Sequence, residues 1–241
     1  MSSFEAPLDQ SAASDTSSSS NNEELRNYHL SIEYKHLQTH SPSGVYLLPH
    51  STLLRSFSGV IFLRRGIYQN AIFKFQVDCG DDYNSPGCSP PKVTFVNPNG
   101  GNPYHPLVDS SGALDVKSLV GTWDSKRCFL ITLLTFVKKA FYIKEFHRGQ
   151  GGVEGGAMRC ERWANEAAFE AFANNREAFI GLVKESVDKS QEMVYEEVEG
   201  GWSFEKQLEG DGMVVRAASK DGVDGILDAI IQMERSAAEP S

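Results

Sequence analysis

The chain has 241 residues and a formal net charge of −9, with 40% hydrophobic and 23% charged residues. This composition predicts one packed domain with appendages and excludes a chain that is disordered throughout. The negative charge argues against a nucleic-acid groove or an anionic membrane surface as the main partner. The sequence has no apolar run of the roughly 18 residues that span a bilayer and no secretion signal at its start, so we expect a cytoplasmic protein without membrane insertion.

The four cysteines lie far apart and form no CxxC pair; they are Cys79, Cys88, Cys128 and Cys160. This spacing favours free thiols over a disulfide framework or a zinc site. We therefore expect neither a metal ion nor another cofactor.

Composition divides the chain into three parts. Residues 1–22 are rich in Ser and Asn and predict a disordered tail, because such a segment buries too little apolar surface to offset its ordering entropy. Residues 23–190 carry the periodic patterns of a folded domain. Residues 191–241 begin with an acidic stretch, which predicts a connector, and end with an apolar stripe at helical spacing, which predicts an amphipathic C-terminal helix. That stripe consists of Val223, Ile226, Leu227, Ile230 and Ile231.

The domain opens with a predicted helix over about 23–37, followed by four runs with strand character. The third run, IFKFQVD, alternates apolar and polar residues, as a half-buried strand does. The connections are too short for crossover helices, so the strands are expected to form a four-stranded antiparallel meander. The predicted strands are 45–48, 57–63, 72–78 and 92–96.

A polar, Pro- and Gly-rich segment over 97–122 has little periodicity, and a stretch of this length inside a compact domain is usually functional. A helix is predicted after Trp123, with Asp124 or Ser125 as its cap. The glycine-rich insertion 149–156 predicts a flexible exposed loop, and residues 159–190 predict a further helix, in one or two pieces. Helices segregated from an antiparallel sheet define an α+β fold.

An ordered set of residues across this region resembles the ubiquitin-conjugating enzyme (UBC) family. The set comprises Tyr83, Pro86, Pro90, Pro91, Tyr104, His105, Pro106, Gly112 and Trp123. In that family a catalytic cysteine follows the histidine by ten residues and a tryptophan follows the cysteine by eight. Counted from His105, these spacings lead to position 115 and then to Trp123. The resemblance implies a UBC-like fold with flanking helices and a helical C-terminal extension, and a cis peptide bond at Pro90–Pro91.

Two positions depart from the family pattern. Position 115 is Asp115, and a carboxylate cannot form the thioester that carries ubiquitin. Leu107 occupies the place of the asparagine whose amide stabilises the oxyanion, and its side chain has no donor to offer. We therefore expect a catalytically inactive pseudo-enzyme with degenerate active-site positions at Asp115, Leu107 and His105. The resemblance implies that His105 braces the loop by bonding to backbone, and we favour this over a role as base or metal ligand.

Within the UBC variants, the strings HPLVD (105–109) and LDVK (114–117) resemble the fused-toes family. This resemblance implies an adaptor subunit that binds a Hook-type coiled-coil adaptor and an FHIP-type protein and links vesicle or endosome cargo to dynein. It also implies a peripheral place on endosomes through these partners, with AKT kinase as a further partner.

Two other functions remain open. The chain can be a variant that binds ubiquitin or pairs with an active conjugating enzyme. Alternatively it can be an active enzyme that uses Cys88 or Cys128, of which Cys88 is expected to be the more exposed. The C-terminal helix can either fold back on the domain or dock onto a partner.

Overall fold

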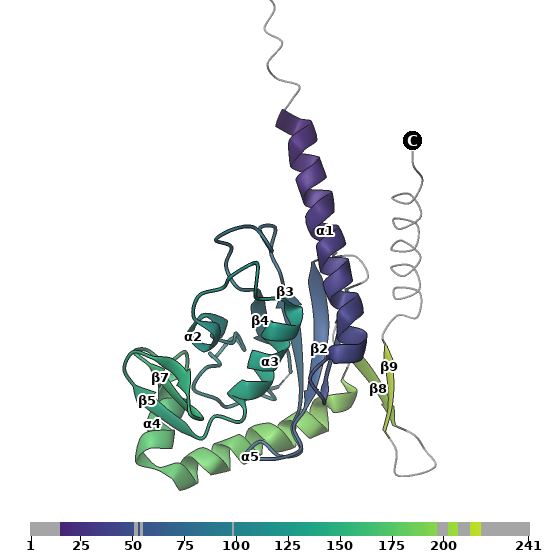
Figure 1. Cartoon of the computed structure of the whole chain (residues 1–241). Helices are drawn as coiled ribbons and strands as arrows, with labels where there is room; N and C mark the ends of the chain where they lie inside the picture. Colours follow the sequence, from purple (N-terminus) through teal and green to yellow (C-terminus); the bar gives the residue numbers. More distant parts are fainter. Residues whose placement is uncertain are drawn as a thin grey trace, which may run out of the picture.

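The computed structural model describes residues 15–50, 53, 55–97, 99–196, 202–206 and 213–217. It has an α+β architecture, in which a four-stranded sheet lies among helices and the long helix α5 runs across the base of the domain (Figure 1). The helices are α1 (Asp15–His40), α2 (Val116–Val120), α3 (Leu130–Ala140), α4 (Glu166–Asn174), α5 (Arg176–Glu192) and the 3-10 helix η1 (Met193–Tyr195). The strands are β1 (Val45–Pro49), β2 (Ser56–Phe62), β3 (Ile72–Asp78), β4 (Lys92–Phe95), β5 (Glu145–Arg148), β6 (Gly152–Glu154), β7 (Ala157–Cys160), β8 (Trp202–Lys206) and β9 (Met213–Ala217).

The predicted four-stranded antiparallel meander is confirmed. Strands β1 to β4 pair in sequence order, and each pairing is antiparallel. The alternation in β3 places Phe73, Phe75 and Val77 in the core, while Gln76 is exposed. Lys74 breaks the pattern, because its side chain is buried on the opposite face of the sheet and its Nζ donates to the carbonyl of Glu196.

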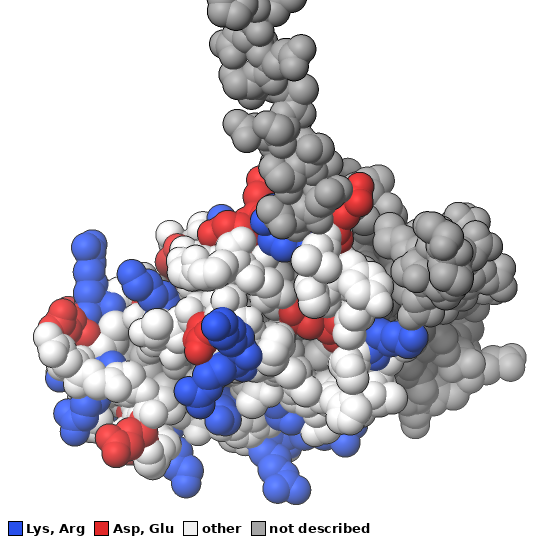
Figure 2. All heavy atoms as spheres, turned by 45° about the horizontal axis from the view of Figure 1, so that its top comes forward, with Lys and Arg blue, Asp and Glu red and all other residues white. Residues whose placement is uncertain are grey.

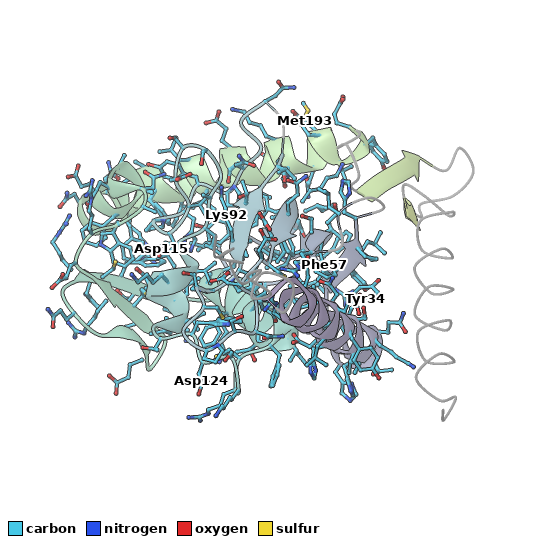
Figure 3. All side chains as sticks on the ribbon, turned by 90° about the horizontal axis from the view of Figure 1, so that it is seen from above. Tyr34, Phe57, Lys92, Asp115, Asp124 and Met193 are labelled. Atoms are coloured by element: carbon cyan, nitrogen blue, oxygen red, sulfur yellow. The ribbon has the colours of Figure 1, made fainter. Side chains whose placement is uncertain are left out.

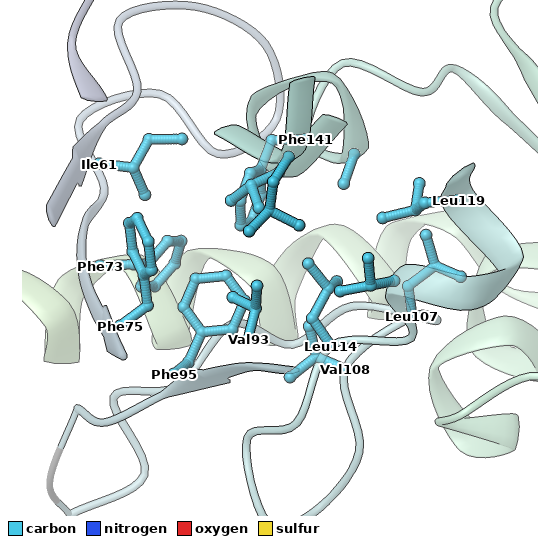
Figure 4. Packing of buried hydrophobic residues seen from close by; sticks show 14 of the residues in the cluster. Ile61, Phe73, Phe75, Val93, Phe95, Leu107, Val108, Leu114, Leu119 and Phe141 are labelled. Atoms are coloured by element: carbon cyan, nitrogen blue, oxygen red, sulfur yellow. The ribbon is translucent and has the colours of Figure 1, made fainter. Parts of the chain in front are cut away.

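Aromatic side chains from the sheet and from the end of α3 make the centre of the core (Figure 4). Phe141, directly after α3, stacks on Phe73 with 5.6 Å between ring centroids, and it meets Phe95 edge-on at 5.8 Å. On the α1 side, Tyr34 stacks on Phe57 at 5.8 Å. Offset-stacked and edge-on geometries suit aromatic rings, so these pairs fix the sheet against both helices.

The helix boundaries differ from the predictions at several ends. Helix α1 begins at Asp15, inside the segment expected to be a disordered tail; once a helix is nucleated, each added residue gains one hydrogen bond, even in a polar sequence. Helix α3 begins at Leu130, so neither Asp124 nor Ser125 caps it. The segment 159–190 does form two helices, but its first residues belong to β7.

The glycine-rich insertion 149–156, expected to be a flexible loop, instead contains part of a three-stranded sheet. Its strand order is β5-β7-β6, with β5 parallel and β6 antiparallel to β7. Gly155 and Gly156 form the two-residue connection between β6 and β7, with φ of 60° and 86°. Positive φ at both positions of such a turn is what a tight hairpin requires. The two glycines therefore allow β6 and β7 to pair as a hairpin.

Four more elements were not predicted. Helix α2 lies inside the polar segment 97–122, and the acidic segment after residue 191 contains η1 and then β8, which pairs antiparallel with β9. The predicted C-terminal helix around Val223 lies outside the described residues. Helices long and apolar enough to cross a bilayer are absent from the described part of the chain.

Candidate functional site

The histidine of the UBC-like motif is part of the packed interior. His105 Nδ1 accepts a hydrogen bond from the backbone N–H of Leu107 at 3.0 Å. Its Nε2 lies 3.2 Å from the carbonyl of Ala140, at the end of α3. A nitrogen that accepts carries no proton, so the ring is neutral with its proton on Nε2, which donates to Ala140. The imidazole therefore connects the loop to α3 through two backbone groups.

Burial also keeps this ring neutral. Desolvation lowers the pKa of His105 to about 4, although the hydrogen bond to Ala140 acts in the opposite direction. The rings of Tyr68, Phe141 and Phe146 surround the imidazole, with centroids 5.4 to 5.7 Å away. A side chain that is enclosed in this way cannot exchange protons with a substrate.

Leu107 and Asp115 are neighbours, joined through their backbones. The N–H of Asp115 donates to the carbonyl of Leu107 at 2.8 Å. The Leu107 side chain is fully buried and lies with Leu114 and Leu119 in the core, as Figure 4 shows. The backbone bond thus holds Leu107, whose side chain belongs to the core, beside Asp115.

Asp115 is half-buried and holds the start of α2. Its Oδ1 accepts a hydrogen bond from the backbone N–H of Ser118 at 2.9 Å, which satisfies one of the free donors of that helix end. The Asp115 carboxylate is therefore a helix cap in this structure.

A close approach between two backbones fixes the loop to the edge of the sheet. The N–H of Phe95 donates to the carbonyl of Gly112 at 2.8 Å, and the N–H of Leu114 donates to the carbonyl of Val93 at 2.9 Å. Gly112 has φ of 87°, and a Cβ there would lie 2.3 Å from the carbonyl oxygen of Phe95. Only glycine fits this position without displacing the backbone.

Trp123 is buried beside Tyr83, with ring centroids 6.4 Å apart. The Tyr83 hydroxyl donates to Glu33 Oε2 of α1 at 2.7 Å. Burial, and then the charge of Glu33, raise the pKa of the Tyr83 phenol. Trp123 thus belongs to a structural contact between α1 and the β3–β4 connection.

Three of the four prolines in the motif, Pro90, Pro91 and Pro106, also have structural positions. Pro90 and Pro91 lead directly into β4, and the carbonyl of Pro106 accepts from the N–H of Asn165, the N-cap of α4, at 2.9 Å. The expected cis peptide at Pro90–Pro91 is wrong, since this bond is trans, the form that most X–Pro bonds adopt.

The four cysteines are free thiols, and most of them are withdrawn from solvent. Cys79, Cys88 and Cys160 are buried, and Cys128 is half-buried against the core. The expectation that Cys88 is more exposed than Cys128 is therefore wrong, because the turn around Tyr83 folds inward. Among the described residues, no group of three or more His, Cys, Asp or Glu side chains could hold a metal ion.

A groove that the sequence analysis did not identify lies between α1 and the segment before α3. Its volume is about 470 Å³, and Ile32 and Phe129, both more than one third exposed, lie at its surface. Figure 3 shows Asp115 well apart from Tyr34 of α1, and Asp115 is not among the residues that line this groove. We call it the α1 groove; its lining residues are His29, Ile32, Glu33, His36, Asn84, Ser125, Lys126, Phe129 and Ile131.

The meander, the loop from His105 to Trp123 and the surrounding helices define a UBC-like domain. A family model described as ubiquitin-conjugating enzyme matches residues 29–139. The crossbronx homolog of Culex quinquefasciatus is 30% identical over 174 residues, which cover 71% of this chain and 69% of that protein. The AKT-interacting protein of Homo sapiens is 34% identical over 116 residues, covering 48% of this chain and 38% of that protein.

The chain belongs to the fused-toes family of UBC variants. The crossbronx homolog of Anopheles gambiae, 25% identical over 173 residues, covers the same 71% of this chain. The matched segment spans less than two fifths of the length of the AKT-interacting proteins.

Proposed function

We propose that the chain is a catalytically inactive adaptor subunit. It joins a Hook-type coiled-coil adaptor and an FHIP-type protein and so links vesicle or endosome cargo to dynein. It is cytoplasmic and reaches endosomes through these partners. Membership of the fused-toes family supports the proposal at the level of protein class, and the partners follow from the resemblance of the motif residues.

One observation supports the proposed lack of catalytic activity. The Asp115 carboxylate accepts a hydrogen bond from the N–H of Ser118, and the Leu107 side chain is packed in the core. Conjugation needs a thiolate at the first position and a donor for the oxyanion at the second. Both groups have been replaced by residues that stabilise the fold. The UBC-like domain then functions only by binding partner proteins.

A charging assay tests this part of the proposal. The chain is incubated with activating enzyme, ATP and ubiquitin, and a reducible adduct is sought on a gel. We expect no adduct with the natural chain. We expect no transfer to lysine with Asp115→Cys either, because Leu107 still supplies no oxyanion donor. Transfer by the natural chain, lost on replacing Cys128 or Cys88, would contradict inactivity; robust transfer by Asp115→Cys would contradict the role assigned to Leu107.

The α1 groove offers a surface for a helix of the coiled-coil adaptor. Leu25, Tyr28 and Ile32 follow one another at three- and four-residue spacing along α1, and all three are exposed. Phe129 adds an exposed ring from the facing segment. An apolar stripe of this kind accepts the apolar face of an amphipathic helix, so we assign the adaptor's helix to it.

Binding measurements with a Hook C-terminal segment test the surface. Ile32→Asp should weaken capture about tenfold or more, since it places a charge in an apolar contact. Ile180→Asp is the matched control, because Ile180 is an exposed isoleucine of α5, outside the groove. Equal capture by both variants would remove the groove from the interface. Absence of binding by the folded natural chain at high concentration would remove the Hook-type partner.

The AKT-interacting proteins are named for an interaction with AKT. We propose AKT kinase as a further partner on this basis. Co-precipitation of the kinase with the natural chain, and its loss in a parallel sample without the chain, would support this assignment.

A further inference from the structure

A second hollow, of about 820 Å³, lies between α2 and the turn that joins β5 to β6. Residues 117–121 form one wall, residues 149–153 form another, and residues 159–162 close it. It is separate from the α1 groove, with which it shares no lining residue. We call it the basic hollow.

Its charged side chains are mostly cationic. Lys117, Arg159 and Arg162 line it, against the single carboxylate of Glu161, which accepts a hydrogen bond from Gln150 Nε2 at 2.8 Å. In the described part of the chain, the exposed side chains of Lys117 and Arg159 make no ion pair or side-chain hydrogen bond. In Figure 2, Lys and Arg lie over the left, the centre and the lower edge of the molecule, with some Asp and Glu among them.

Glycines beside Arg159 leave its side chain exposed to solvent. Arg159 is paired with Gly152 across the β6–β7 hairpin, and its Cδ lies 3.2 Å from where a Cβ on Gly151 would be. A larger residue at position 151 would press against the arginine side chain. Gly149, Gly151 and Gly152 thus leave the cations accessible and present bare backbone at the rim.

The hollow also has an apolar component. Leu119, Val120 and Phe136 line it, and the Lys139 ammonium lies 5.4 Å from the centroid of the Phe136 ring. Cations around an apolar surface match a ligand that carries carboxylates beside an apolar side chain. The chain as a whole is strongly acidic, which opposes binding to an anionic membrane or a nucleic acid. A short peptide, in contrast, interacts mainly with the nearby cations of the hollow and less with the net charge of the whole chain.

We propose that the basic hollow between α2 and the β5–β6 turn binds an acidic peptide segment of a partner protein, with carboxylates on Lys117 and Arg159 and an apolar side chain against Phe136. This assignment is independent of the Hook-type partner at the α1 groove.

Fluorescence anisotropy with the full chain tests it, using the labelled peptide GEDLDEG and its basic counterpart GKKLKKG. We expect only the acidic peptide to bind. Arg159→Glu and Lys117→Glu should each weaken binding about tenfold or more, because like charges then face each other. Lys184→Glu makes the same charge change at an exposed position of α5 and should leave binding within about twofold.

Amide spectra of the labelled chain locate the peptide. Glycine amides at positions 149, 151 and 152 line the hollow and should shift on titration. Failure of the acidic peptide to bind, equal loss in Lys184→Glu, or shifts confined to other residues would each overturn the proposal. So would binding to phosphatidylserine vesicles in the absence of peptide binding, which would assign the hollow to a membrane.

Discussion

Asp115 Oδ1 accepts a hydrogen bond from the backbone N–H of Ser118 at 2.9 Å, and this bond makes the carboxylate the N-cap of α2. Replacing an N-cap aspartate by alanine removes about 1 kcal/mol of stability. We therefore expect Asp115→Ala to lower the free energy of unfolding by about this amount, as measured by urea denaturation. Asp115→Asn should change it by only a few tenths, because asparagine caps as well.

The control for this prediction is Asp188→Ala, which removes an exposed aspartate from α5. A surface change of this kind stays within about 0.5 kcal/mol. If Asp115→Ala behaved like the control, the carboxylate would have no capping role. The residue at the degenerate centre would then need another explanation.

The buried imidazole of His105 makes stability depend on pH. Its folded-state pKa of about 4 lies below the ordinary value of 6.5, so the unfolded chain binds more protons between these two values. The contribution of the buried, neutral imidazole to the free energy of unfolding is therefore complete above pH 6.5 and is lost as the pH falls toward 4. The whole contribution is on the order of 3 kcal/mol.

Urea denaturation at a series of pH values between 7 and 4 measures this effect. His105→Gln should flatten the part of the pH dependence that lies between the two pKa values, whatever its effect on absolute stability. His147→Gln, which changes an exposed histidine of β5, should keep the natural slope. An unchanged slope in His105→Gln would mean that other groups cause the acid sensitivity.

Local sequence patterns were sufficient to predict the meander and the core helix. In β3 the alternation of Phe73 and Phe75 with polar residues encodes both the strand and its buried face. In the same way, the stripe formed by Leu130, Leu133 and Val137 encodes the buried face of α3. These signals are reliable because each depends on the period of a single element.

Features that depend on distant partners could not be predicted. The α3 N-terminus is bonded by Glu33, almost a hundred residues earlier, and the buried Lys74 donates to the carbonyl of Glu196, more than a hundred residues later. The glycine-rich insertion was misleading for another reason: the composition that suits a flexible loop also suits a tight hairpin. The spacing of the motif singled out Asp115 and Leu107, but their roles as helix cap and core residue depend on the three-dimensional structure.

Two glycines with positive φ allow steric contact to be separated from backbone strain. A Cβ on Gly112 would lie 2.3 Å from the Phe95 carbonyl oxygen, whereas a Cβ on Gly121 would meet no atom within 4 Å. Both changes put a Cβ on a residue with positive φ, and at Gly121 the combination of φ 72° and ψ −122° also lies outside the left-handed helical region. Gly112→Ala must in addition displace the backbone at β4, so we expect it to be less stable than Gly121→Ala by about 1 kcal/mol or more.

Thermal or urea unfolding of the two alanine variants measures the difference directly. Similar losses in both would show that the loop can move away from β4 without cost. The larger loss at position 112 would show instead that the contact with Phe95 holds the loop that positions Leu107 and Asp115.

Glu33 joins three parts of the fold through one carboxylate. Its oxygens accept from the Tyr83 hydroxyl at 2.7 Å, from Asn84 Nδ2 at 2.7 Å and from the N–H of Leu130 at 2.9 Å. Glu33→Ala leaves the buried Tyr83 hydroxyl and the first N–H of α3 without this acceptor. Leaving buried donors unsatisfied should cost about 2–4 kcal/mol in the free energy of unfolding.

Glu33→Gln should fall between the natural chain and Glu33→Ala, because its single amide oxygen can replace only one of the two carboxylate oxygens. Glu24→Ala changes an exposed glutamate of the same helix and should be near neutral. Tyr83→Phe gives a second readout: combined with Glu33→Ala, it should cost less than the sum of the two single changes, because both remove the same hydrogen bond. If the two changes were additive, the loss would come from helix α1 alone, and the proposed junction between α1, Tyr83 and α3 would be wrong.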